Sequence, residues 1–301
     1  MDFLFPLDYS TPVFRPPSEA HSLLLQLTLG CSHNRCTFCN MYRSKTYTVR
    51  SVESLKGEID QAAKYYGDTA PLKVFFCDGD ALGAPMDTLV PVLEHLNHKL
   101  PNLRRVGIYA TAPNILEKSV PELILLAKLN LNLAYLGLES GSDQVLKMVV
   151  KGNSASDMVE ASDKLRSGGW QSSVIAMLGL GGREFSREHV EKSGETVSQM
   201  SPDFFSFLTT IPVPGTPYAR QIKQGGLTPL TVRELLSEMH DMLERIDPQH
   251  GRVIFRANHV SNQHPLGGVL PEDTPAMLSQ IKQWITQSPQ GSYPEISPHE
   301  L

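Results

Sequence analysis

Short apolar runs alternate with longer amphipathic stretches along most of the chain. The apolar runs have the length and composition of buried strands, and the stretches between them repeat their apolar residues at helical spacing. The predicted strands are 23–29, 72–76, 105–110, 133–138, 173–178 and 203–211. The predicted helices are 52–66, 86–99, 115–128, 142–149, 154–167 and 186–200. Strands that alternate with helices pair in parallel through right-handed crossovers, so the pattern predicts six βα units.

A polar or glycine-rich segment ends or follows each predicted strand. In chain order these segments are GCSHNRCTFC, CDGDALG, ATAPN, LESGS, GLGG and TIPVPGTP. Barrels of parallel strands carry their sites at the carboxyl ends of the strands. We therefore expect an α/β fold, a partial (β/α)6 TIM-type barrel over residues 21–217 with its loops around one cavity. A lead segment, 1–20, precedes it, and a mainly helical capping region with a loose tail, 218–301, follows.

Composition and charge narrow the setting. The 301 residues include 27 Lys and Arg against 32 Asp and Glu, a net charge of −5, with no long basic run. This balance argues against a dedicated nucleic-acid-binding domain. The start MDFLFPLDYS lacks the basic region of a signal peptide, and no apolar stretch reaches the length of a membrane span. Clustered thiols fit a reducing compartment, so we expect a cytoplasmic protein.

Three of the four cysteines, Cys31, Cys36 and Cys39, lie within nine residues, and the fourth is Cys77. The CxxxxCxxC spacing with a distant fourth cysteine is typical of plant-type ferredoxins, which would make this an electron-transfer protein. Without Cys77, a [4Fe–4S] cluster would keep one iron open for a substrate. The same residues also allow a structural zinc site that includes His33, or buried thiols that bind nothing. The spacing alone favours the ferredoxin.

This combination of motifs resembles the radical S-adenosylmethionine superfamily over residues 23–217. It is most similar to the branch of oxygen-independent coproporphyrinogen oxidases and tRNA methylthiotransferases. The resemblance implies that Cys31, Cys36 and Cys39 hold a [4Fe–4S] cluster whose open iron chelates S-adenosylmethionine (SAM). Reductive cleavage of SAM then yields a 5′-deoxyadenosyl radical that abstracts hydrogen from a substrate. The family has three residues in the first cysteine gap, whereas this chain has four.

The resemblance also implies cofactor contacts at the other strand ends. Its candidates are Phe38 before the last cysteine, Gly79 and Asp80 for the methionine ammonium, Glu139 for the ribose with Ser140 beside it, Lys151 for the methionine carboxylate, Gly179 and Gly181 near the adenine, and Pro212 in the PGTP ending. Each motif has a plainer interpretation, such as a turn with a helix cap, a solvated strand end or a rigid loop. No catalytic residue is assigned.

The resemblance makes Cys77 a buried thiol rather than a ligand. Beyond residue 217 we expect helices over 231–246 and 277–286. The polar segment 256–264 between them either binds substrate or caps the barrel. The substrate, small or macromolecular, is not identified. A radical enzyme of this kind needs an external electron donor such as flavodoxin or ferredoxin.

Overall fold

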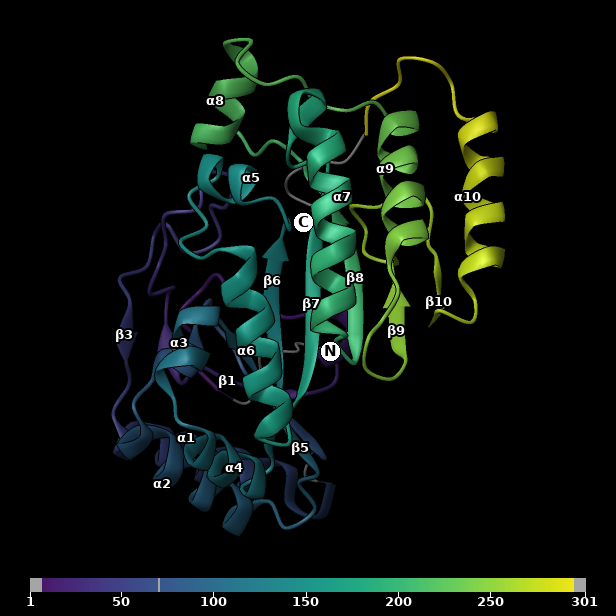
Figure 1. Ribbon diagram of the computed structural model, residues 1–301. Helices are drawn as coiled ribbons and strands as arrows, with labels where there is room; N and C mark the ends of the chain where they lie inside the picture. The colour runs from purple at the N-terminus through teal and green to yellow at the C-terminus, as the bar shows by residue number, and fades with distance from the viewer. Residues whose placement is uncertain (1–6, 70, 295–301) are drawn as a thin grey trace. The chain divides into compact units, whose positions relative to one another are not determined.

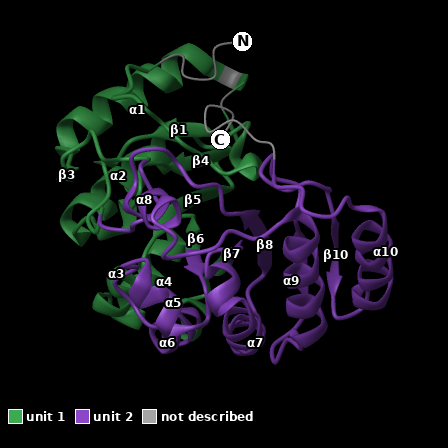
Figure 2. Cartoon of the chain, turned by 90° about the horizontal axis from the view of Figure 1, so that it is seen from above, with its two compact units in different colours: residues 1–34, 41–136, 163–172 green, residues 35–40, 137–162, 173–301 purple. Residues whose placement is uncertain are grey.

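The computed structural model describes residues 7–69 and 71–294. The first six residues of the predicted lead segment and the last seven of the predicted tail lie outside this description. The chain divides into two compact units, coloured separately in Figure 2. Unit 1 comprises residues 1–34, 41–136 and 163–172, and unit 2 comprises 35–40, 137–162 and 173–301. The domain boundaries at residues 20 and 217 stay predictions.

Unit 1 is built on parallel strands in the order β1, β4, β5 and β6. Its strands are β1 (Leu23–Leu25), β4 (Lys73–Phe76), β5 (Arg105–Ala110) and the first part of β6 (Leu131–Glu139), with β2 (Thr28–Leu29) and β3 (Thr48–Val49) paired antiparallel. Its helices are α1 (Val52–Tyr66), α2 (Met86–Lys99), α3 (Ala112–Glu117) and α4 (Val120–Lys128). The predicted alternation of parallel strands and helices is therefore present here.

Unit 2 continues the same alternation. Its strands are β7 (Gln171–Leu178), β8 (Phe204–Thr209), β9 (Val253–Arg256) and β10 (Gly267–Leu270), all parallel except β10. Its helices are α5 (Asp143–Met148), α6 (Ala155–Ser167), α7 (Gly182–Met200), α8 (Pro217–Lys223), α9 (Val232–Arg245) and α10 (Thr274–Gln287). Helices α7, α9 and α10 lie side by side (Figure 1). The last residues of α6 and the first of β7 belong to unit 1.

Two predicted elements differ from the structure, and two strands were not predicted. The strand 23–29 is interrupted because the Leu27 N–H donates to the Leu25 carbonyl, a local turn that breaks the ladder. The helix 115–128 is two helices, since Ser119 and Glu122 form a capping box that starts α4 anew. The C-terminal region contains β9 and β10, which the sequence did not predict. Each has only four residues, too few for a clear alternation.

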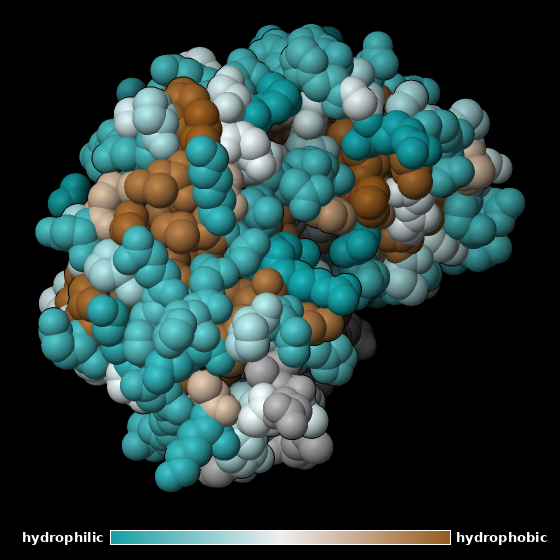
Figure 3. All heavy atoms as spheres, turned by 90° about the horizontal axis from the view of Figure 1, so that it is seen from below, coloured by the Kyte–Doolittle hydropathy of each residue, from teal (hydrophilic) through white to brown (hydrophobic). Residues whose placement is uncertain are grey.

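The face drawn in Figure 3 is mostly hydrophilic, with hydrophobic patches between polar side chains. In the described part of the chain, the exposed large apolar side chains are Tyr65, Leu72, Ile124, Leu125, Val150, Ile254, Val260 and Tyr293. Among the described residues, no helix combines the length and the apolar character that crossing a membrane requires.

Candidate functional site

The turn after β4 packs against the first cysteine in unit 1. The Gly79 N–H donates to the carbonyl of Gly30, the residue before Cys31, at 2.9 Å. A Cβ on Gly79 would lie 2.7 Å from the Cβ of Cys31 and 2.9 Å from the ring of Tyr42. Only glycine fits so close an approach. The structure therefore brings two sequence candidates, Cys31 and Gly79, together.

Asp78 holds this turn in place. Its carboxylate accepts from the Gly30 N–H at 2.7 Å and from Gln26 Nε2 at 3.0 Å, and it pairs with Lys45 Nζ at 2.8 Å. The carboxylate is fully buried, and only 5% of the Lys45 side chain is exposed. Asp78 also adopts a left-handed backbone with φ of 70°, a strained conformation that is concentrated at functional sites. Asp78 therefore binds the protein rather than presenting its carboxylate to a ligand.

Asp80 is buried at the other end of the turn. Its Oδ2 accepts from the hydroxyl of Ser32, which follows Cys31, and from Asn114 Nδ2 at the start of α3. Burial raises the pKa of Asp80, against hydrogen bonds that lower it. Asn114 is the last residue of the ATAPN segment, which the sequence analysis placed at the same end of the strands as this turn without giving Asn114 a role. Asp80 thus ties the segment that follows Cys31 to the strand ends of unit 1.

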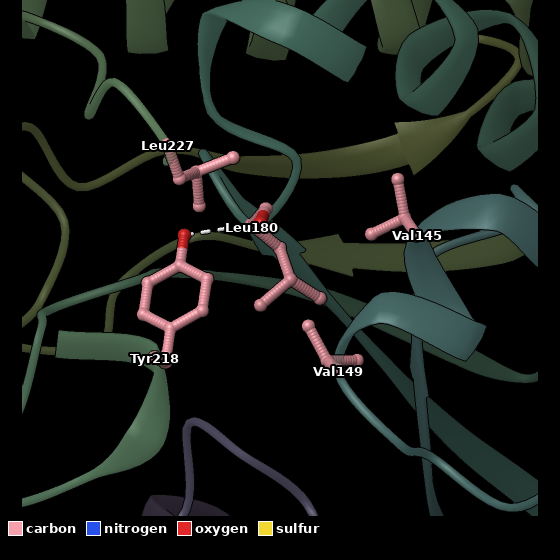
Figure 4. Close-up of a cluster of buried hydrophobic side chains, with 5 residues drawn as sticks. All are labelled: Val145, Val149, Leu180, Tyr218 and Leu227. Atoms are coloured by element: carbon pink, nitrogen blue, oxygen red, sulfur yellow. Dashed lines mark hydrogen bonds between the residues drawn. The ribbon is translucent and has the colours of Figure 1, made fainter. Parts of the chain in front are cut away.

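The CxxC half of the motif lies in unit 2. The Thr37 N–H donates to the Val149 carbonyl at 2.9 Å, and the Tyr218 N–H donates to the Thr37 carbonyl at 3.1 Å. Phe38 packs on the buried cluster drawn in Figure 4, which consists of Val145, Val149, Leu180, Tyr218 and Leu227. Two backbone bonds and one aromatic side chain therefore fix the segment between Cys36 and Cys39. Phe38 is a packing residue of this segment.

The four cysteines fall into two classes. None forms a disulfide, and Cys31, Cys36 and Cys39 are partly exposed in their loop. Cys77 is fully buried, and burial raises the pKa of its thiol far above the usual range, with Asp78 adding to the effect. A metal ligand must be a thiolate. Partial exposure leaves Cys31, Cys36 and Cys39 open to become thiolates, whereas Cys77 is the buried thiol that the sequence analysis expected.

Glu139 and Lys151 form an ion pair in unit 2, with Oε1 and Nζ 2.8 Å apart. Glu139 ends β6 in a left-handed conformation, φ 63°, and a Cβ on Gly137 would clash with its carboxylate and with the Lys151 ammonium. Their side chains are 12% and 14% exposed. The two charged candidates at and after the end of β6 thus lie together. A carboxylate next to an ammonium can bind the ammonium and the carboxylate of an amino-acid-like ligand.

Ser140 points into the protein. Its hydroxyl lies 2.8 Å from Nδ1 of the buried His189, and it also accepts from the Ser142 N–H at 3.0 Å. Burial lowers the pKa of His189 to about 4, so the ring is neutral at pH 7. A Cβ on Gly141 would lie 2.2 Å from the carbonyl oxygen of Lys192. The LESGS motif therefore packs closely against α7, and the hydrogen bond of Ser140 with His189 holds it there.

The remaining candidates lie on loops of unit 2. Gly179 is left-handed, with φ of 77°, and Gly181 is the N-cap of α7. Pro212 is half-buried in the loop after β8. In the PGTP ending, Thr216 caps α8, as its side chain accepts from the Ala219 N–H. The plainer interpretation, a rigid loop with a helix cap, accounts for this ending.

The polar segment after β9 binds the end of β8. Asn262 donates to the Phe207 carbonyl at 2.7 Å and accepts from the Thr209 hydroxyl at 3.0 Å. His264 stacks on Trp284, with ring centroids 4.6 Å apart. A capping role therefore describes Asn262. A small hollow next to it is lined by Leu178, Thr209, Val232, Leu235, Leu236, Met239, Asn262, Gln263 and His264.

Comparison with known proteins gives a family for this chain. The family model of the radical SAM superfamily matches residues 25–195. No curated protein matches the sequence. The matched span contains every candidate cofactor-binding and metal-binding residue except Pro212, and the polar segment 256–264 also lies beyond it.

Solved structures share the fold. Coproporphyrinogen III oxidase (HemN) from Escherichia coli superposes with a TM-score of 0.58 at 16% identity, over 74% of this chain and 50% of the oxidase. The methyltransferase TsrM from Kitasatospora setae, described with cobalamin and a [4Fe–4S] cluster bound, gives 0.56 at 18% identity over 75% and 44%. Methylornithine synthase (PylB) gives 0.52 at 16% identity over 91% and 83%.

These identities are low, so the likeness concerns the fold. It confirms the α/β class and the partial TIM-type barrel. The chain spans about half the length of the Escherichia coli oxidase.

Proposed function

Because the chain belongs to the radical SAM superfamily, enzymes that use a [4Fe–4S] cluster and SAM, we propose that Cys31, Cys36 and Cys39 hold its cluster. The observation that supports this proposal is the close contact of Gly79 with Cys31. The resemblance implies that Gly79 meets the methionine ammonium and that Cys31 holds the cluster. Partial exposure of the three thiols supports it. The branch of oxygen-independent coproporphyrinogen oxidases and tRNA methylthiotransferases remains part of the proposal.

When bound, the cluster and SAM supply a 5′-deoxyadenosyl radical that abstracts hydrogen from the substrate. The chain's own residues bind SAM and orient it. The backbone at Gly79 and the buried Asp80 bind the methionine ammonium, and Lys151 binds its carboxylate. Glu139 accepts from the ribose hydroxyls, while Ser140 fixes the end of β6 through His189.

The other contacts are to apolar and backbone groups. Gly179 and Gly181 form the loop beside the adenine, and Pro212 contributes a cofactor contact from the loop after β8. Phe38 keeps the CxxC segment on its apolar cluster. An external electron donor, such as flavodoxin or ferredoxin, provides the reducing electron. The clustered thiols favour a reducing compartment, the cytoplasm. Both small and macromolecular substrates are compatible with these residues.

The test is cleavage of SAM by the reconstituted protein. The protein is loaded anaerobically with iron and sulfide, reduced in the presence of SAM, and assayed for 5′-deoxyadenosine. We expect release by the wild-type protein and none by Cys36→Ala. Cys77→Ala is the matched control, and we expect it to keep both its iron and the cleavage. A colourless protein with bound zinc would contradict the proposal.

The second candidate function is electron transfer with Cys77 as the fourth ligand. It predicts that Cys77→Ala loses as much iron as Cys39→Ala and that SAM is not cleaved. Full burial of Cys77 in unit 1 favours the three-ligand site.

A further inference from the structure

A buried carboxylate from α9 holds the loop after β7 in unit 2. Glu238 is 2% exposed. Its Oε2 accepts from the Gly179 N–H at 2.6 Å, and its Oε1 accepts from the Ser186 hydroxyl at 2.6 Å. Gly179 and Glu238 are 59 residues apart, and Glu238 lies outside the segment that the family model matches. Helix α9 thus contributes a fixed hydrogen-bond acceptor to a loop of the matched region.

Other parts of unit 2 restrain the same loop. The Tyr218 hydroxyl contacts the carbonyls of Gly179 and Leu180 at 3.2 and 3.0 Å, and Figure 4 shows its bond to Leu180. A Cβ on Gly179 would lie 2.8 Å from a methyl group of Leu235, one turn before Glu238 on α9. The loop is therefore held by polar contacts on both its N–H and C=O sides and has no room for a side chain at Gly179.

Burial makes the ionised form of Glu238 energetically unfavourable. Burial raises its pKa to about 7, and the neighbouring Glu234 adds to the rise, while the bonds from Ser186 and Gly179 lower it. No basic side chain of the described residues is among the groups that shift this pKa. A buried acid without a cation stabilises a fold poorly. A role in fixing the loop explains why the acid is there.

We propose that Glu238 is a positioning residue for SAM: it fixes the backbone of the loop from Gly179 to Gly181 so that its peptide groups meet the adenine. This inference rests on the proposed function, since that function places the loop beside the adenine. Glu238 itself does not touch the cofactor. Each oxygen of its buried carboxylate accepts one hydrogen bond, from Gly179 or Ser186, and its effect reaches SAM through the loop.

The experiment measures SAM binding to the anaerobically reconstituted full chain by equilibrium dialysis. We expect Glu238→Ala to raise the dissociation constant about tenfold, the usual effect of losing a hydrogen bond to a charged group. Glu238→Gln keeps an oxygen for the Gly179 N–H and an amide for the Ser186 hydroxyl, so it should stay within about threefold of wild type. Glu244→Ala, an exposed position on the same helix, is the matched control and should bind like wild type.

A purely structural role would not produce this pattern. Positioning predicts that Glu238→Ala raises the KM for SAM in 5′-deoxyadenosine release but leaves iron content and the rate at saturating SAM near wild type. Rescue by glutamine is the second signature. If Glu238→Ala does not fold, Ser186→Ala replaces it, with an expected rise in the dissociation constant of about threefold.

The outcomes separate the two proposals. If the wild-type protein binds SAM and Glu238→Ala binds it equally well, the positioning role is wrong and the proposed function stands. A glutamine variant that folds but binds as weakly as alanine also overturns the positioning role. If the wild-type protein with a full cluster does not bind SAM, the proposed function itself is wrong.

Discussion

Two loops at strand ends, one in each unit, are held by the same kind of contact, a glycine N–H that donates to a buried carboxylate. The electrostatic surroundings of the two carboxylates differ. In unit 1 the N–H of Gly30 donates to the buried Asp78 at 2.7 Å, and in unit 2 the N–H of Gly179 donates to the buried Glu238 at 2.6 Å. The two glycines have nearly the same backbone, with φ of 76° and 77°. In both places a left-handed glycine aims its N–H at a carboxylate from a distant part of the chain.

The difference is the cation. Asp78 pairs with Lys45, which also donates to two backbone carbonyls, at Ser10 and Pro12. Within residues 7–69 and 71–294, the donors to Glu238 are a hydroxyl and the glycine N–H, and its pKa rises to about 7. A buried carboxylate without a cation becomes sensitive to pH. The turn beside Cys31 is thus held by an ion pair, and the loop after β7 is held by a carboxylate whose charge depends on pH.

The largest expected effect is that of Asp78→Ala. The substitution leaves the Lys45 ammonium buried without its anion, which typically costs about 3–5 kcal/mol in the free energy of unfolding. We expect a chain that unfolds early in denaturant and keeps little iron after reconstitution, because the Gly30 turn next to Cys31 loosens. Iron content and a denaturation curve measure both.

Asp60→Ala is the matched control for Asp78→Ala. Asp60 is also paired, with Lys99 and His95, but its side chain is 48% exposed. Exposed ion pairs contribute little, so this variant should match wild type in iron content and stability. Equal losses of iron and stability in the two variants would show that Asp78 stabilises the protein no more than an exposed, paired aspartate does.

The next largest expected effect is on the pH dependence of the free energy of unfolding, which should distinguish the two loops. The pKa of Glu238 is raised in the folded state, to about 7 from 4.5, so the folded chain binds more protons between these values. The stabilisation from this proton is present at low pH and is lost as the pH rises towards 7. The difference amounts to about 3 kcal/mol at most, from 1.36 kcal/mol per pKa unit.

The measurement compares denaturation of wild type and Glu238→Gln from pH 4.5 to 8. Wild type should lose stability relative to the glutamine variant as the pH rises through this window. A constant difference between the two proteins would mean that Glu238 does not change its charge there, and the contrast with Asp78 would disappear.

The smallest effect concerns the glycines themselves. An alanine in a left-handed conformation costs about 1–2 kcal/mol. Gly225 has a φ of 75°, and a Cβ added to it would meet no atom within 4 Å, so Gly225→Ala gives this backbone cost alone. Gly30→Ala and Gly179→Ala should both cost more in denaturation experiments, because their methyl groups meet neighbours at 3.3 and 2.8 Å. Equal losses of stability at all three positions would mean that the neighbouring atoms move aside without an energetic cost.

Periodicity predicted most of the fold because the strands and helices of a parallel α/β fold carry strong patterns. Helices 52–66 and 86–99 match α1 and α2 in the structure. The prediction was wrong where a local bond overrides the pattern, as at Leu27, and where one capping box divides a continuous apolar stretch at Ser119. Strands β9 and β10 are too short for periodicity to indicate them.

The candidate site was predicted only in part. Cys31 and Gly79 were found because each belongs to a motif, and the structure places them in contact. His189 and Glu238 were missed, and Asn114 was placed in a strand-end segment without a role, because each acts across a long sequence separation through one or two hydrogen bonds. Single polar residues on helices give no local signal. The motif predicted where a ligand would bind, but not which buried groups hold the loops.

The most direct test of the three-cysteine site is the electron paramagnetic resonance spectrum of the reduced cluster with and without SAM, in wild type and in Cys77→Ala. The three-ligand account predicts a cluster signal in both proteins, and a change in that signal when SAM is added, since SAM binds the open iron. A spectrum unaffected by SAM, with the signal lost in Cys77→Ala, would contradict it.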